Sequence, residues 1–307
     1  MISSVSSIGS DWFLDGITNL QRQQVKTQRQ ISSGFRVADA SDAPSQAAAL
    51  VDLGSHLASA KTYQSNLGRI QTEVNTAEQA VSSVTTLLDN ARSLATQGAS
   101  SGTSATDRQY LAVQVRSLVQ ETVTAANTSV EGRFVFGGDQ DQSPPYAVNS
   151  TSVTGVDRLT AAVATRTIVN PDGQSVYRAR TALTIFDHSD SAGVPASDNV
   201  FAALQGLATA LQSNDSTGIT NSIESLKGAS DWLNQQQAAY GTDTNHISAE
   251  QNRIADSITS LQSRISDIRD TDVAQAATDL SLEQTAQSAA FGAQAKISQR
   301  SLFDYLG

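Results

Sequence analysis

Apolar residues near the C-terminal end of the chain recur at alternating steps of four and three. They are Ile254, Ile258, Leu261, Ile265 and Ile268, and polar residues fill the gaps between them. This spacing places the apolar side chains on one face of a helix and is typical of a coiled-coil seam. The chain must therefore fold largely as long helices, each covered by another helix.

The N-terminal segment from Asp11 to Ile31 repeats this pattern. We expect a helix there, capped by Ser10 or Asp11. Its seam positions are Phe13, Ile17, Leu20, Gln24, Thr27 and Ile31. Because both ends of the chain carry the same pattern, we predict that the two terminal helices pair.

Beyond Asp270 the C-terminal seam becomes thinner and richer in alanine. It continues through Val273, Ala276, Leu280, Ala286, Ala290, Ala293 and Ile297, and then through Leu302, Phe303, Tyr305 and Leu306. An apolar helix with nothing of its own to cover it is expected to bind another surface. We predict that the two arms, residues 1–40 and 270–307, are largely disordered in the free subunit and fold on assembly.

Between the terminal segments, apolar spacing predicts further helices. They run from Ser45 to Gln97, from Ala105 to Ser129, from Phe201 to Asn214 and from Thr217 to a break at Asp270 to Asp272. Ser41 or Asp42 is the expected cap of the first, after a linker at Ala38 to Pro44. Short turns between long helices indicate an antiparallel bundle.

The segment from Gly132 to about Ala196 has a different character, because it holds four of the five prolines and several β-branched runs. Thr165 to Val169 and Gln174 to Tyr177 flank Asn-Pro-Asp-Gly, which predicts a hairpin, and Thr181 to Asp187 is predicted as a further strand. The expected organisation is an N-terminal arm, two halves of a helical core that flank a β-rich insertion, and a C-terminal arm. Their bounds are 1–40, 41–131, 132–197, 198–269 and 270–307.

Charge and composition exclude several classes of function. The formal net charge is −10 and the basic residues form no cluster, which argues against nucleic acid and against an anionic membrane surface. No apolar run approaches the roughly 20 residues that a membrane-spanning helix needs, so no membrane insertion is expected. The first ten residues lack the features of a cleavable secretory signal, and a cytoplasmic location is the default expectation. Cysteine is absent.

The sequence predicts no catalytic, cofactor-binding or metal-binding residues, and we expect no enzyme. Three histidines lie far apart, and three glycines after residue 131 match neither a dinucleotide nor a phosphate loop. Asp139 and Asp141 favour an Asx-type turn over a calcium loop, and the aspartates around residue 270 favour capping and breaking a helix over acid–base work. The histidines are His56, His188 and His246; the glycines are Gly132, Gly137 and Gly138; the aspartates are Asp267, Asp270 and Asp272.

Three segments in the same order resemble the bacterial flagellin family, and within it most closely the proteins of the hook–filament junction. They are SSGFRVADASDAP at Ser32 to Pro44, EGRFVFGGDQDQSPPY at Glu131 to Tyr146, and DIRDTDVAQAATDL at Asp267 to Leu280, together with the terminal KISQRSLFDYLG. Ala43 stands where the family more often has a second aspartate. Pro44 favours the junction proteins over flagellin.

The resemblance implies a mainly α, elongated, flagellin-like antiparallel helical bundle or coiled coil with paired terminal helices and a small β-rich insertion. It implies a structural subunit of the flagellum, exported unfolded without a cleaved signal and located outside the cell at the hook–filament junction, which replaces the cytoplasmic default. The implied partners are further copies in a ring, hook-associated protein 1, flagellin, and the export chaperone and apparatus.

Under this resemblance the terminal helices form the inner tube of the assembly. The predicted interface residues are Phe13, Ile17, Leu20, Ile31, Leu280, Ala290, Ile297, Leu302, Phe303, Tyr305 and Leu306. The nearest alternative is a flagellin that builds the filament itself. A helical signalling or adhesion module is a third possibility, and it predicts a membrane span or a signal sequence.

Overall fold

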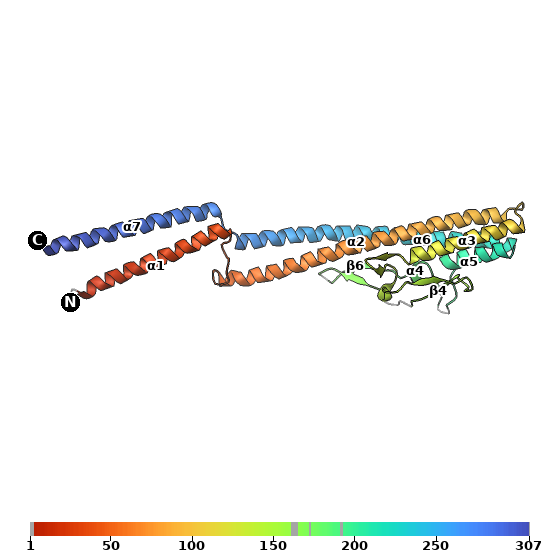
Figure 1. Ribbon diagram of the computed structural model, residues 1–307, viewed down its shortest axis with the longest axis horizontal. Coiled ribbons are helices and arrows are strands. Elements are labelled where there is room, and N and C mark those ends of the chain that lie inside the picture. Colours follow the sequence, from red (N-terminus) through yellow and green to blue (C-terminus); the bar gives the residue numbers. More distant parts are fainter. Residues whose placement is uncertain (1–2, 161–164, 172, 191–192, 307) are drawn as a thin grey trace. The chain divides into compact units, whose positions relative to one another are not determined.

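The structure is a computed structural model that describes residues 3–160, 165–171, 173–190 and 193–306, and within them the side chains from 12 to 296. The described chain is mainly α, as predicted. Its helices are α1 (Ser3–Ser33), α2 (Pro44–Ala99), α3 (Ala105–Ala126), α4 (Ala182–Ile185), α5 (Val200–Gln212), α6 (Ser216–Arg269) and α7 (Val273–Leu306) (Figure 1). None of the described helices carries an apolar stretch long enough to cross a membrane.

The chain divides into two compact units. The first contains Met1–Lys61 and Asp256–Gly307, and the second contains Thr62–Ala255. Helices α2 and α6 each contribute residues to both units. The break predicted between Asp270 and Asp272 is confirmed, because α6 ends at Arg269 and α7 begins at Val273.

The second unit has a closely packed helical core. On α2, Leu67, Val74 and Leu88 are fully buried. Leucines of α5 and apolar residues of α6 are also fully buried in this unit, namely Leu204, Leu207, Leu211, Ile219, Leu226 and Leu233. Complete burial of side chains of this size is the main source of stability in such a core.

The turn from α2 to α3 is fixed by side-chain caps. Ser104 and Asp107 form a reciprocal capping box at the start of α3. Arg108, which is buried, donates from Nε to the Gly98 carbonyl at 2.8 Å and from Nη1 to Asn214 Oδ1 at 2.5 Å. This arginine therefore ties the end of α2 to the turn between α5 and α6.

In their described residues, the insertion and the segment just before it contain three separate two-stranded antiparallel sheets. They pair β1 (Ser129–Val130) with β2 (Arg133–Phe134), β3 (Tyr146–Val148) with β4 (Val156–Arg158), and β5 (Thr167–Val169) with β6 (Ser175–Arg178). The predicted hairpin around Asn-Pro-Asp-Gly is confirmed by β5 and β6. A short 3₁₀ turn, η1 (Gly138–Gln140), follows β2.

The strand predicted at Thr181 to Asp187 is wrong, because residues Ala182–Ile185 form the single-turn helix α4. The Thr181 side chain caps this helix by accepting a hydrogen bond from the Thr184 amide at 3.3 Å. Burial favours the helix over a strand, because Ile185 and Phe186 are fully buried. The Phe186 ring packs against Phe136 at a ring separation of 5.1 Å. Tertiary packing overrides the β-branched preference of the segment.

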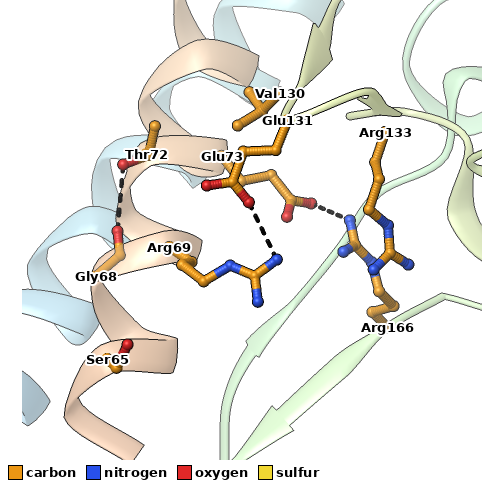
Figure 2. Close-up of a pocket in the computed structure, with 9 residues that line it drawn as sticks. All are labelled: Ser65, Gly68, Arg69, Thr72, Glu73, Val130, Glu131, Arg133 and Arg166. Atoms are coloured by element: carbon orange, nitrogen blue, oxygen red, sulfur yellow. Dashed lines mark hydrogen bonds and ion pairs between the residues drawn. The ribbon is translucent and has the colours of Figure 1, made fainter. Parts of the chain in front are cut away.

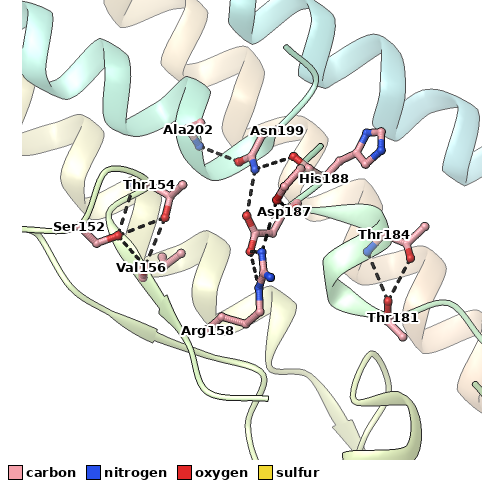
Figure 3. A network of polar contacts seen from close by, with 11 residues as sticks. Ser152, Thr154, Val156, Arg158, Thr181, Thr184, Asp187, His188, Asn199 and Ala202 are labelled. Atoms are coloured by element: carbon pink, nitrogen blue, oxygen red, sulfur yellow. Dashed lines mark hydrogen bonds and ion pairs between the residues drawn. The ribbon is translucent and has the colours of Figure 1, made fainter. Parts of the chain in front are cut away.

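A buried polar network anchors the insertion to α5 (Figure 3). Asp187, beyond α4, accepts hydrogen bonds from the guanidinium of Arg158 at 2.6 and 3.0 Å and from Asn199 Nδ2 at 2.9 Å. Asn199 also caps α5 by accepting from the Ala202 amide. The single carboxylate of Asp187 therefore joins β4 to the start of α5.

Candidate assembly interface

Helices α1 and α7 lie side by side and antiparallel in the first unit (Figure 1). Phe13 meets Phe291 edge to face at a ring separation of 6.4 Å. Further along, Gln24 Nε2 donates to Gln287 Oε1 and Thr27 Oγ1 donates to Glu283 Oε1, both at 3.2 Å. The predicted pairing of the terminal helices is therefore confirmed within the described residues.

The packing between these helices is thin compared with the seam that the sequence suggested. The predicted interface residues with described side chains are all only half-buried; they are Phe13, Ile17, Leu20, Ile31, Leu280 and Ala290. Along the pair, Thr27 and Ala276 are buried, with 8% and 5% exposure. The predicted residues Ile297, Leu302, Phe303, Tyr305 and Leu306 lie outside the described side chains.

Several large apolar side chains of the terminal pair face solvent. Trp12 is 81% exposed and Leu282 is 64% exposed, and Leu14, Val25 and Phe291 are also exposed. The seam analysis passed over these residues because they fall off the line of alternating four-residue and three-residue steps. An apolar residue on the polar side of an amphipathic helix was the available signal, since it marks a second face that needs cover.

The linkers that join these helices to the rest of the chain pair with each other. Phe35 and Asp270 form an antiparallel bridge. Arg36 N–H donates to the Arg269 carbonyl at 2.7 Å, and Thr271 N–H donates to the Gly34 carbonyl at 2.9 Å. Gly34 ends α1 with a φ of 75°, a conformation that glycine adopts without steric cost.

Side chains reinforce this antiparallel pairing of the two linkers. The Arg36 guanidinium donates to the carbonyls of Asp267 and Ile268 at 3.3 and 2.9 Å, which satisfies acceptors left free at the end of α6. The Arg269 guanidinium lies 4.2 Å from the centre of the Phe35 ring. The paired linkers therefore bring together two of the segments that carry the family resemblance, Ser32 to Pro44 and Asp267 to Leu280.

Two predicted helix caps are corrected by the structure. Helix α1 begins at Ser3, so Ser10 and Asp11 lie inside it. Helix α2 begins at Pro44, and the Asp42 carboxylate accepts instead from the amides of Ala38 and Asp39 at 3.1 and 2.9 Å, closing the linker on itself. Competition from these nearer amides explains the difference.

Aspartates of the linkers are stabilised in their charged form. The amides of Asp39 and Ala38 lower the pKa of Asp42. At the other linker, the Ser266 hydroxyl and then Arg269 lower the pKa of Asp270. Asp272 caps α7 by accepting from the amides of Ala274 and Gln275 at 2.9 and 3.1 Å, as the sequence led us to expect for this cluster.

The remaining candidate residues have structural contacts. In place of the expected Asx-type turn, the buried Asp141 carboxylate binds Arg133, eight residues earlier in the chain, at 2.5 Å. His188 lies 3.1 Å from Asp198 and stacks on Trp232. No cluster of three or more metal-binding side chains occurs in the described part of the chain. What the first unit offers is an incompletely covered pair of helices, which suits association with other helices.

Comparison with known proteins agrees with this reading of the terminal helices. A family model of the bacterial flagellin N-terminal helical region matches residues 12–141, and one of the bacterial flagellin C-terminal helical region matches residues 223–306. The chain belongs to the bacterial flagellin family. As a member of it, the chain is a structural component of the bacterial flagellum.

Individual relatives lie on the hook-associated side of the family. Flagellar hook-associated protein 3 of Escherichia coli is 26% identical over 94% of this chain and 94% of its own length. A Vibrio parahaemolyticus structure classed as a flagellar hook-associated protein has a TM-score of 0.64 at 18% identity, covering 75% of this chain and 100% of its own. The flagellar junction protein FlgL of Legionella pneumophila has a TM-score of 0.56 at 12% identity, covering 72% and 99%. The two solved structures support the fold.

Proposed function

We propose that this chain is a structural subunit of the junction between the flagellar hook and the filament. In this role, copies of the chain form a ring that rests on hook-associated protein 1 and receives flagellin above. The observation that carries the proposal is the similarity to hook-associated protein 3 of Escherichia coli, which extends over nearly the whole of both chains. Pro44, at the start of α2, also favours the junction proteins over flagellin.

The terminal helices are the surfaces through which the ring would form. Exposed Trp12 and Leu14 on α1, and Leu282 on α7, are apolar side chains that a neighbouring subunit would cover. Burying each such side chain contributes about 1.5–3 kcal/mol. The apolar residues predicted near the C-terminus, Leu302 to Leu306, would add axial contacts. In this proposal the arms 1–40 and 270–307 fold fully only on assembly.

The subunit would reach its place through the flagellar export channel, unfolded and without a cleaved signal, with help from an export chaperone. Arms that remain unfolded before assembly suit passage through a narrow channel. The location that follows is outside the cell, at the hook–filament junction.

Deletion of the gene followed by electron microscopy tests the junction role. Cells that carry hooks without filaments and shed flagellin into the medium are the expected result. Normal filaments on the deletion strain would contradict the proposal. Long filaments formed by the purified protein alone would favour the alternative that this chain is itself a flagellin.

A single-tryptophan variant tests whether α1 is covered on assembly. The chain has two tryptophans, so Trp232→Phe leaves Trp12 as the only reporter. We expect its emission to shift to shorter wavelength when the subunit is incorporated. The matched variant Trp12→Phe reports on Trp232, whose Nε1 donates to the Ile185 carbonyl inside the second unit, and its emission should stay constant. Equal behaviour of the two variants would count against the proposed interface.

A further inference from the structure

A polar cavity of about 260 Å³ lies in the second unit, beside the turn between β1 and β2 (Figure 2). One wall is a face of α2, formed by Ser65, Gly68, Arg69, Thr72 and Glu73. The remaining lining residues are Val130, Glu131, Arg133 and Arg166. We call this cavity the Arg69 pocket. It lies at the start of the second segment that carries the family resemblance, and neither the fold nor the proposed assembly accounts for it.

Two of the three arginines in the pocket are held by buried carboxylates. Arg166 Nη2 lies 2.5 Å from Glu73 Oε1, and Arg133 binds Asp141 through Nε at 2.8 Å and Nη2 at 2.5 Å. Glu73 and Asp141 are both buried. Burial raises the pKa of Glu73, and Arg166 opposes that effect. These two pairs are fixed parts of the pocket wall.

The third arginine has a different kind of partner. Arg69 Nη2 binds Glu131 Oε2 at 3.1 Å, and the two side chains are 60% and 63% exposed. An ion pair this open to water contributes little to stability and exchanges its partner easily. Arg69 is therefore the arginine of the pocket whose present partner an incoming anion can most easily replace.

Glu131 occupies a strained backbone position. Its φ is 53°, and that of Gly132 is 78°, so the pair forms the two-residue turn between Val130 and Arg133 with both residues in the left-handed region. Glycine, asparagine and aspartate are the usual residues at the first of these positions, whereas glutamate has a longer side chain and lacks their local hydrogen bonds. Strain kept at a position whose side chain enters a pocket points to a role for that side chain.

The charges of the pocket favour an anion. Asp141 and Glu73 offset the charges of Arg133 and Arg166, so when the exposed Glu131 carboxylate turns to solvent, the charge of Arg69 is left without a partner in the pocket. A guanidinium presents N–H donors in a planar fork that fits a carboxylate, and Arg133 has donors beyond the two that bind Asp141. The group already bound to Arg69 is itself a carboxylate.

We infer that the Arg69 pocket is a carboxylate-binding site, and that Glu131 is a built-in occupant which an external carboxylate displaces. The external group binds Arg69 and Arg133, while Glu131 moves into water. The pairs Glu73–Arg166 and Asp141–Arg133 keep the walls in place. This inference is independent of the proposed place of the chain in the flagellum.

Titration of the purified, isotope-labelled protein with succinate, followed by NMR, tests the site. We expect saturable shifts of the amides from Gly68 to Glu73 and from Val130 to Arg133. Glu131→Gly removes the competing carboxylate at a position that favours glycine, so the variant should fold and bind succinate roughly twofold to fivefold more tightly, which is the range expected for release from an exposed ion pair. Glu131→Gln separates loss of the carboxylate from relief of strain.

Two arginine variants complete the test. Arg69→Gln should lose the succinate-dependent shifts, whereas Arg92→Gln, on the same helix and with an exposed ion pair to Asp89, should retain them. Absence of saturable shifts in both the wild type and Glu131→Gly would overturn the inference. So would equal succinate binding by wild type and Arg69→Gln, provided both spectra show a folded protein.

The source of the carboxylate is distinguished by sedimentation of the same proteins. If an acidic side chain of a second copy is the ligand, Glu131→Gly will self-associate more strongly than wild type, and adding Arg69→Gln will reverse the change. Unchanged sedimentation together with tighter succinate binding identifies a small free carboxylate. Either result supports the site.

Discussion

The helices of the two units achieve very different degrees of burial. In the second unit, Leu67, Val74 and Leu88 of α2 are fully buried. In the first unit, Phe13, Ile17 and Leu20 of α1 are only half-buried, although the sequence spacing is equally regular. Regular spacing therefore shows that a helix has an apolar face, but it does not show that the face is covered within the same chain.

The chemical basis of the difference is the number and size of the partners. The unit that contains the buried face of α2 also holds fully buried leucines of α5 and α6. Helix α1 has as its partner α7, whose seam is largely alanine. Among the described side chains, one ring pair and two hydrogen bonds join the two helices. Alanine permits close approach but buries little area, which supports the proposal that further subunits cover the terminal pair.

Truncating matched leucines should give the largest contrast. Leu88→Ala in the core removes a fully buried side chain and should lower the free energy of unfolding by about 2–5 kcal/mol. Leu20→Ala on α1 should lower it by less than about 1 kcal/mol in the free subunit, because its face is incompletely covered. Urea unfolding followed by circular dichroism measures both, and equal losses would remove the distinction between the regions.

Polar contacts should show the same contrast on a smaller scale. Asp187→Ala takes a buried carboxylate away from Arg158 and Asn199 and should cost about 2–3 kcal/mol. Asp39→Ala breaks an exposed pair with Arg29 at 3.5 Å and should cost less than about 1 kcal/mol. Thermal unfolding of the two variants provides the comparison. A larger loss for Asp39→Ala would contradict it.

The pKa values of one acidic side chain from each region should be shifted in opposite directions. Of the three contrasts, this one should have the smallest effect on stability. Burial raises the pKa of Glu73 above its ordinary value of 4.5, so its contribution favours the folded state at low pH and is lost as pH rises through the folded pKa. The pKa of Asp42 is lowered below 3.8, so its contribution is present above that value and is lost on acidification. NMR titration of the two carboxyl carbons measures both, and shifts of the same sign would refute this expectation.

Much of the helical framework could be predicted because apolar spacing is a local property. The break after Arg269 and the hairpin around Asn-Pro-Asp-Gly could also be predicted, because aspartates and turn residues influence the conformation of their neighbours in the sequence. The helix at Thr181 was missed because its conformation depends on burial of Ile185 and Phe186. Asp42 was wrongly predicted to cap α2, because its carboxylate binds the nearby amides of Ala38 and Asp39 instead of the first amides of the helix.

The candidate interface was only partly accessible from the sequence. Phe13, Ile17 and Leu20 follow from the seam, but Trp12 and Leu282 fall off it, and their exposure shows that they lack cover. The Arg69 pocket joins α2 to residues about 60 and 100 positions further on. No local pattern predicts contacts between segments so far apart, because the fold brings them together.

Hydrogen–deuterium exchange of the free subunit and of the assembled flagellum tests most directly whether the terminal helices are completed by neighbouring subunits. In the free subunit, we expect amides of α1 and α7 to exchange rapidly while those around Leu67 to Leu88 of α2 remain protected. On assembly, α1 and α7 should become protected while α2 changes little. Equal protection of α1, α7 and α2 in the free subunit would contradict the account.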